Sequence, residues 1–433
     1  MDGFQIIALL ITLAALFSYL NHRFLGLPTT IGLMVFGLLT SFCLIAAGRL
    51  VPELESAALA LLERIDFDDT LMHGMLGFLL FAGALHVDLE DLAAQKGVIA
   101  LLASVGLLIS TAVVAVLTWG VLRGLGIEIP FMLCLLFGAL ISPTDPIAVL
   151  AILKTMSVPK SLETKITGES LFNDGLAVVV FLAISGAAGL GGGHTDEGSL
   201  VMNLLRLFAL ETIGGAVFGA AVGWIAFLAF RSVDSYEVEI LISLALVSGG
   251  YALAQVLHVS GPIAMVVAGL LIGNHGRRLA MSDSTREHLD TFWKLMDEIL
   301  NAILFVLIGL EVIVLSVHGS WLAAAVLAIP ITLVGRALGV GIPLTALRRL
   351  RRFTPHAAKV LTWGGLRGGI SVALALSLSG TLGRADRDAY EGILLMTYVA
   401  VSFSILVQGL TMAPLLRRLG VDRELADGGD EGI

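Results

Sequence analysis

Long apolar stretches, separated by short polar or Gly/Pro-rich links, recur along the whole chain. They fall at residues 4–20, 29–47, 70–86, 97–119, 129–153, 168–188, 200–230, 237–257, 261–275, 293–316, 320–342, 356–380 and 389–416. Because a helix needs about 20 mainly apolar residues to span a bilayer, the pattern predicts an all-α polytopic membrane protein with about 13 transmembrane helices. Residues 50–66 have the pattern of an amphipathic surface segment.

The composition supports a membrane protein and excludes several other classes. Apolar residues make up 57% and charged residues 14% of the chain, whereas a soluble domain carries about 25% charged residues. No basic patch with interleaved aromatics suggests nucleic acid. Cys43 and Cys134 both lie in apolar stretches, so we expect packing residues and neither a disulfide nor a cofactor. The N-terminus lacks a basic n-region, so we expect the first stretch to be a retained span.

The positive charges alternate from loop to loop. Eighteen of the 26 Lys and Arg residues fall in loops on one side of the predicted spans, six fall on the other side, and Arg336 and Arg367 lie within spans. Lys and Arg are enriched in cytoplasmic loops. We therefore expect a multi-pass protein of the cell inner membrane with the N-terminus outside and the C-terminus in the cytoplasm.

The stretch 129–153 is interrupted at its middle by Ser142, Pro143, Thr144, Asp145 and Pro146. Two prolines remove two amide donors and clash with the preceding turn, so the helix must break there. Transporters build ion sites at such breaks. Since a central charge costs roughly 2.5–3.5 kcal/mol on insertion scales, Asp145 favours a cation or proton site, and a packing kink is the alternative.

A second polar group follows in the stretch 168–188. Ser170 and Asp174 are four residues apart and share a helix face, and Glu169 and Asn173 form the adjacent stripe. Asp174 and Ser170 can offer oxygen ligands to a hard cation. Glu169 also fits a helix N-terminus at the membrane surface, an alternative that does not account for Asp174 one turn deeper.

The stretch 356–380 carries Arg367 among four glycines, at positions 364, 365, 368 and 369. Glycines weaken a helix and let other backbones approach. A buried arginine needs an acidic partner, for which we expect Glu169, and snorkelling to the surface is the alternative. For Arg336 a structural tether and a functional role stay open. The stretches 129–153 and 356–380 run in opposite directions, a pattern typical of inverted repeats with broken crossing helices.

Three motifs, in order and spacing, resemble the sodium/proton exchanger branch of the cation:proton antiporters, the NhaP-like bacterial proteins. They are Thr144-Asp145-Pro146, the run from Glu169 to Asp174, and the run from Trp363 to Gly369. The likeness covers nearly the whole chain. One departure is Ala82 after Leu79-Leu80-Phe81, where relatives often have an acid, so fine cation selectivity does not follow from the resemblance.

The resemblance implies thirteen helices, an NhaA-like inverted-repeat fold and a homodimer. It implies a moving core bundle at residues 97–188 and 317–417, a dimer scaffold at 1–96 and 189–316, and a short acidic cytoplasmic tail at 418–433. It also implies a set of site residues: Asp145, Asp174, Ser170 and the Thr144 carbonyl as sodium ligands, Glu169 as a nearby cation- or proton-binding residue, Asn173 steadying the crossing, and Arg367 paired with Glu169.

The expected function is secondary exchange of a monovalent cation for a proton, for pH and sodium homeostasis. Burial disfavours a charged carboxylate, so one Asp can hold either a proton or a cation. Because Asn173 cannot take a proton, we expect electroneutral one-for-one exchange. The spacing does not separate sodium or lithium from potassium. An intramembrane aspartyl protease with Asp145 and Asp174 as its dyad is a different-class alternative, but Asn173-Asp174-Gly175 lacks the expected Gly-x-Gly-Asp context.

Overall fold

The computed structural model describes residues 3–49, 51, 67, 70–153, 156, 158–190, 200–315, 319–348 and 356–421. Within these ranges the chain is almost wholly helical, and extended pairing is confined to one isolated bridge. Eight of the described helices are long and apolar enough to cross a membrane. The predicted all-α membrane fold is confirmed, while the number of spans stays a prediction. The predicted amphipathic segment at 50–66 lies outside the described residues except for residue 51, and so does the tail beyond residue 421.

The first half of the chain ends in the long helix α10. Its elements are α1 (Gly3–Leu20), η1 (Asn21–Leu25), α2 (Thr29–Gly48), η2 (Thr70–Met75), α5 (Leu76–Leu85), α6 (Leu89–Leu101), η3 (Leu102–Gly106), α7 (Leu107–Gly124), α8 (Phe131–Ile141), α9 (Ile147–Leu153) and α10 (Lys160–Ala187). Several starts follow from residue type. Pro28, Pro130 and Pro159 each stand at an N-cap, and the Asp88 side chain accepts hydrogen bonds from the first amides of α6.

The second half begins with the long helix α11. Its elements are α11 (Leu200–Ser232), α12 (Tyr236–Val256), α13 (Gly261–Leu271), η4 (Ile272–Gly276), α14 (Arg277–Leu279), α15 (Asp283–Leu310), η5 (Glu311–Val314), α16 (Gly319–Leu347), α17 (Ala357–Trp363), α18 (Gly369–Leu376), η6 (Ser377–Gly380), α19 (Leu382–Ala385), α20 (Arg387–Phe403), η7 (Ser404–Gln408) and α21 (Gly409–Leu419). The side chains of Ser260, Ser282 and Asp386 cap α13, α15 and α20.

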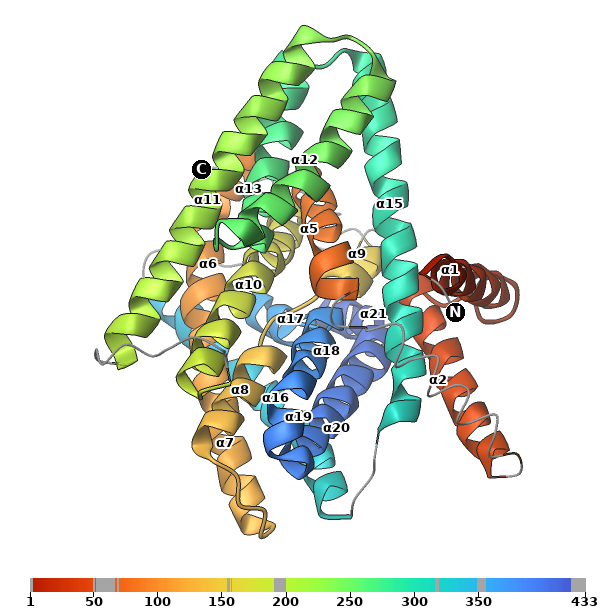
Figure 1. The fold of residues 1–433 in the computed structure, drawn as a ribbon, viewed down its shortest axis with the longest axis vertical. Helices are drawn as coiled ribbons and strands as arrows, with labels where there is room; N and C mark the ends of the chain where they lie inside the picture. The colour runs from red at the N-terminus through yellow and green to blue at the C-terminus, as the bar shows by residue number, and fades with distance from the viewer. Residues whose placement is uncertain are drawn as a thin grey trace.

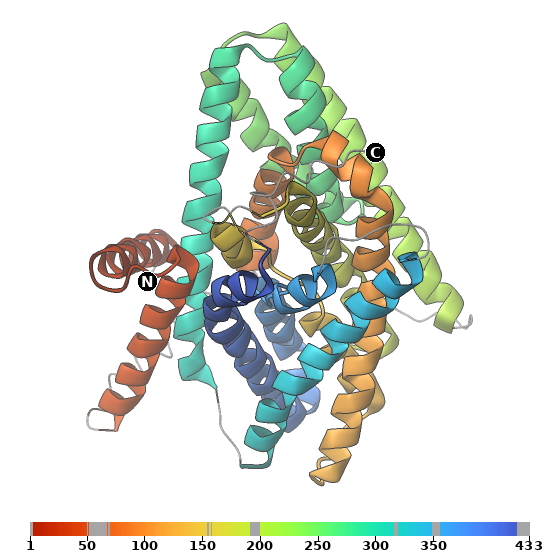
Figure 2. The same ribbon diagram turned by 180° about the vertical axis from the view of Figure 1, so that it is seen from behind.

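Helices of the two halves intermingle around the centre of the molecule. In Figure 1, α15 runs from the end of the molecule where α11 connects to α12 down past α9. Helices α1 and α2 lie beyond α15 at the edge. Figure 2 shows from behind that α16 (light blue) packs across α7 (light orange). Large apolar side chains remain exposed on α1, α2, α11 and α12, including Phe4, Phe42 and Trp224. Such surfaces are compatible with lipid.

Two helices are interrupted where they meet. Residues 142–146 separate α8 from α9, and residues 364–368 separate α17 from α18. We call these the proline break and the glycine break. They touch through their backbones, because the Asp145 amide donates a hydrogen bond to the Leu366 carbonyl at 2.8 Å. The interruption predicted for each stretch is therefore present, and the two interruptions cross at one point.

Candidate functional site

The proline break exposes backbone and places one carboxylate. Helix α8 ends at Ile141, and α9 does not start until Ile147 because Pro143 and Pro146 cannot continue a helical hydrogen-bond ladder. The Asp145 carboxylate accepts a hydrogen bond from the Ile147 amide at 2.9 Å and so caps α9. The break thus holds Asp145 in a fixed place between two half-helices.

Helix α10 is joined to the proline break by side chains. The hydroxyls of Thr144 and Ser170 are 3.0 Å apart, and the Asn173 amide donates to the Thr144 hydroxyl at 2.9 Å. The Thr144 amide donates to the Asn173 oxygen at 3.4 Å. All three residues are buried. Asn173 therefore contacts the break from two sides, which fits the steadying role that the resemblance implies.

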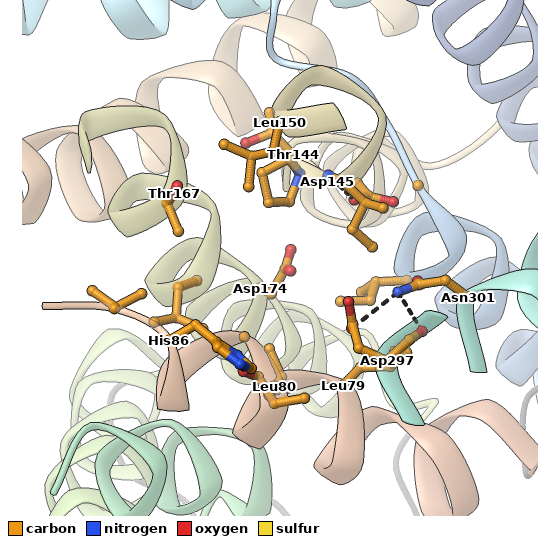
Figure 3. Close-up of a pocket in the computed structure, with 18 of the residues that line it drawn as sticks. Leu79, Leu80, His86, Thr144, Asp145, Leu150, Thr167, Asp174, Asp297 and Asn301 are labelled. Atoms are coloured by element: carbon orange, nitrogen blue, oxygen red, sulfur yellow. Dashed lines mark hydrogen bonds between the residues drawn. The ribbon is translucent and has the colours of Figure 1, made fainter. Parts of the chain in front are cut away.

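Asp145 and Asp174 line one cavity of about 730 Å³. In the close-up of Figure 3, Asp174 points from α10 into the space between Thr144 and Asp145 on one side and Asp297 on the other. No described residue donates a hydrogen bond to the Asp174 carboxylate. A carboxylate that lines a cavity without a fixed donor is available to a proton or a cation.

The cavity reaches the molecular surface at one end, which we call the mouth. Lys160, Lys294 and Glu298 line it there and are exposed, with the Lys160 side chain 75% accessible. Asp88 and Asp91 also line this end, and Asp91 pairs with Lys160 at 2.6 Å. Hydrogen bonds from the Glu90 and Asp91 amides lower the pKa of Asp88 below its usual value, so Asp88 stays charged at neutral pH. The mouth therefore carries negative charge.

The prediction that Arg367 pairs with Glu169 is wrong. The Arg367 guanidinium instead donates to the carbonyls of Ser142 and Pro143, the second at 3.0 Å. These carbonyls lose their helical partners at the proline break, and the C-terminal end of a helix is negatively polarised. Arg367 is thus a cationic cap on α8.

Glu169 pairs with Arg336, whose role the sequence left open. The two terminal guanidinium nitrogens of Arg336 donate to the Glu169 carboxylate, Nη1 to Oε1 and Nη2 to Oε2 at 3.0 Å. Both residues are buried. Arg336 also donates to the Leu361 carbonyl at 2.9 Å, one turn from the end of α17. Glu169 does not line the cavity. Its predicted part in ion binding stays a prediction, and its carboxylate is held by Arg336.

The glycines of the second break leave room for these charges. A Cβ atom added at Gly365 would overlap the Arg336 guanidinium, and one added at Gly368 would overlap the Asp145 carboxylate. The Arg367 amide donates to the Ser404 hydroxyl at 2.9 Å, so the irregular backbone finds partners in η7. The close approach expected from the glycine run is present.

Sequence reasoning missed the wall of the cavity that α15 supplies. Asp297 and Asn301 lie across from Asp174 (Figure 3), and the Asn301 amide donates to the Asp297 carboxylate at 3.0 Å. Both residues stand at the start of the predicted stretch 293–316, where polar side chains usually face water at the membrane surface. Only the four-residue spacing could have indicated a shared face. Ala82 of α5, where relatives often have an acid, also lines the cavity.

The donor atoms suit a cation that passes through. Among the described residues, no group of three or more His, Cys, Asp and Glu could hold a metal ion. The cavity is lined by Asp145, Asp174 and Thr144, whereas Ser170 hydrogen-bonds with the Thr144 hydroxyl and is not a lining residue. Oxygen donors at a broken helix suit a small hard cation as cargo.

Comparisons with known proteins agree with these observations. The family model described as "Sodium/hydrogen exchanger, transmembrane" matches residues 10–418. The Na(+)/H(+) antiporter NhaP of Pseudomonas aeruginosa is 51% identical over 420 residues, which is 96% of each protein. NhaH of Halobacillus dabanensis is 35% identical over 97% of this chain and 100% of its own length. The sodium proton antiporter MjNhaP1 of Methanocaldococcus jannaschii at pH 8 superposes with a TM-score of 0.75 at 19% identity, covering 97% of this chain and 99% of that chain, so the fold is shared.

Proposed function

This chain belongs to the sodium/hydrogen exchanger family, and on that premise we propose that it exchanges sodium for protons through the cavity lined by Asp145 and Asp174. The family is one of transporters, so the protein is not an enzyme and the protease alternative is set aside. Relatives named as sodium/proton antiporters favour sodium, and nothing among them favours potassium. The observation that carries the proposal is the meeting of two carboxylates in one cavity at a helix break.

Competition for one site produces the exchange. Asp174 accepts a proton or contributes to a sodium site, and the two cargoes exclude each other because they use the same carboxylate. Alternating access then requires the core bundle to rock against the scaffold, so that each cargo leaves on the opposite side. The sodium ligands in this proposal are Asp145, Asp174, Ser170 and Thr144. The contacts of Thr144 with Ser170 and Asn173 support it, since they hold these oxygens together.

We propose one sodium ion per proton. Asn173 occupies the position beside Asp174 and donates to Thr144, so it is neutral and already engaged. A site that holds either one proton or one sodium ion has the same charge in both loaded states. The membrane potential, worth about 2.3 kcal/mol per charge per 100 mV, then does no net work on the cycle.

The domain division, orientation and membrane location that we propose follow the topology predicted from the sequence. Residues 97–188 and 317–417 form the moving bundle, residues 1–96 and 189–316 form the scaffold of a homodimer, and the mouth beside Lys160 faces the cytoplasm. The exposed lysines at the mouth support this orientation, because Lys and Arg favour the cytoplasmic side. The protein would lie in the cell inner membrane.

Proton flux in everted vesicles tests the exchange. Sodium or lithium added to acidified vesicles should collapse the proton gradient, whereas potassium should have little effect. Vesicles without the protein provide the control. Equal or larger responses to potassium would overturn the choice of sodium, and no cation response at all would overturn the exchange itself.

Reconstituted liposomes test the stoichiometry. With the potential clamped by potassium and valinomycin, the sodium-driven rate and the final pH gradient should not depend on the clamped value. A systematic shift with potential would show net charge transfer. Asn173→Asp adds a second acid beside Asp174 and should introduce that dependence, which gives the measurement a positive control.

A further inference from the structure

The cavity ends partway along α15. This helix lines it with Lys294, Asp297, Glu298, Asn301 and Leu304, and contributes no lining residue beyond Leu304. Beyond that point Phe305 and Ile308 are fully buried, with exposed fractions of 1% and 0%. Leu304 also packs on Gly369, the first residue of α18 after the glycine break. The site therefore communicates with the mouth and is closed toward the far end of α15.

One face of α15 continues through this closed region. The Glu311 amide donates to the Leu307 carbonyl, so helical geometry extends to Glu311. Spacings of four, three, four and three residues place five side chains on that face: Asp297, Asn301, Leu304, Ile308 and Glu311. At 1.5 Å per residue, Glu311 lies about 21 Å beyond Asp297. The same face thus carries a carboxylate on each side of the site.

The far carboxylate is buried in this conformation, next to an unsatisfied hydroxyl. Glu311 is 7% exposed, whereas Asp297 lines the open cavity. Tyr398 of α20 is 1% exposed, its hydroxyl has no hydrogen-bond partner among the described residues, and it lies within electrostatic range of Glu311. A buried polar atom without a hydrogen-bond partner destabilises the conformation that leaves it unpaired. A conformation that hydrates this region would recover that free energy.

We propose that Glu311, with the Tyr398 hydroxyl, attracts sodium at the opposite mouth of the transport path when the closed side opens. This inference rests on the proposed sodium/proton exchange and adds a second, outer cation-attracting position to it. Glu311 begins η5, directly after the proposed scaffold helix α15, and Tyr398 lies on the proposed bundle helix α20, so rocking of the bundle would separate them. The carboxylate and the phenol oxygen then face water, as Asp297 and Asn301 do on the present open side.

The expected effect depends on the side from which sodium arrives. A carboxylate at a narrow, low-dielectric entrance raises the local cation concentration and the association rate by about 10-fold or more, an effect that salt screens. Removing Glu311 should therefore weaken sodium binding from the far side only. Removing Asp297 should weaken it from the mouth side only.

Sodium dependence measured from both sides tests the proposal. The variants are Glu311→Gln and its matched control Asp297→Asn, assayed in everted and in right-side-out vesicles at low ionic strength. Glu311→Gln should raise the apparent sodium KM on the far side by about 3- to 10-fold and leave the mouth side unchanged. Asp297→Asn should give the mirror result. Equal changes on both sides, no change, or a change confined to the mouth side would overturn the role of Glu311. If the wild-type protein shows no exchange, the proposed function fails instead.

A chemical measurement keeps the test decisive if Glu311→Gln does not insert. Glu311→Cys, in a background with Cys43 and Cys134 replaced by serine, is exposed to a membrane-impermeant thiol reagent from the far side. Labelling that depends on sodium or proton gradients would support the proposal. Absence of labelling under every gradient would contradict it. Tyr398→Phe, which removes only the hydroxyl, should raise the far-side KM in the same direction but less, and an unchanged value would remove Tyr398 from the proposal.

Discussion

The proline break and the glycine break meet at one crossing but are built from different residues. Pro143 and Pro146 open the first by removing amide donors, and glycines open the second by removing side chains. The first carries the carboxylate of Asp145 into the cavity. The second carries the guanidinium of Arg367 toward the carbonyls of Ser142 and Pro143. Two related interruptions therefore contribute opposite charges.

An arginine side chain also caps the half-helix that precedes each break, and the two arginines differ in their partners. Arg367 caps α8, where its guanidinium donates to two backbone carbonyls, whereas Arg336 caps α17 and also pairs with Glu169. The comparison teaches that the halves divide their roles. The proline break and α10 supply carboxylate and hydroxyl oxygens, and the glycine break supplies positive charge and space.

The largest expected effect comes from removing the acid on the ligand side. Asp174→Asn should insert normally and abolish cation-driven proton movement, because an amide holds neither the proton nor the charge that the exchange needs. Asp283→Asn, at a side chain 98% exposed at the start of α15, serves as the control and should exchange normally. Wild-type flux from Asp174→Asn in proteoliposomes would remove Asp174 from the site.

Removing one partner of the buried Glu169–Arg336 ion pair should mainly reduce the stability of the protein. Removing one partner of a buried ion pair typically costs about 3–5 kcal/mol, since a lone charge remains. Glu169→Ala and Arg336→Ala should each lower the thermal unfolding temperature in detergent, and the double variant should lose less than the sum. Combining Glu169→Ala with Arg367→Ala should show weaker coupling. Stronger coupling to Arg367 would contradict the partnership seen here.

A smaller effect should follow from filling the gap between the two breaks. In Gly368→Ala the added Cβ overlaps the Asp145 carboxylate, and such overpacking costs about 1–3 kcal/mol. Sodium-driven flux should fall while the amount of inserted protein stays similar. Gly380→Ala is the matched control, because a Cβ there meets open space. Equal flux in both variants would mean that the crossing does not need this close approach.

The fold and the chemical groups of the site could be predicted, but their pairing could not. Apolar length predicted the all-α membrane fold. Pro143, Pro146 and the glycine run predicted the breaks, because these residues act on their own backbone. Which arginine meets Glu169 depends on how α10, α16 and α17 pack, and helical spacing within one segment carries no such information. The position of Asp297 across the cavity from Asp174 could not be predicted for the same reason, since the two residues lie far apart in sequence.

The mildest effect should come from loosening the junction between α10 and the proline break. Asn173→Ala removes two hydrogen bonds to Thr144, and losing such a buried contact costs about 1–3 kcal/mol, part of which water in the site can restore. The sodium KM should rise modestly with little change in maximal rate. Leu182→Ala, at a half-exposed position of the same helix, should leave both unchanged. An unchanged KM in Asn173→Ala would show that this junction does not shape the site.

In the proposed exchange cycle, the charges gathered at the crossing would also protect the ion gradient against leakage. Three carboxylates and two guanidinium groups gather around this point, so with both cavity aspartates ionised and unloaded these five groups carry one excess negative charge: Asp145, Glu169, Asp174, Arg336 and Arg367. Either cargo cancels it. An empty bundle would have to carry that charge past an apolar seal at roughly 2.5–3.5 kcal/mol, which slows its return about a hundredfold. In the proposed cycle, this charge would itself suppress the return of the bundle without cargo.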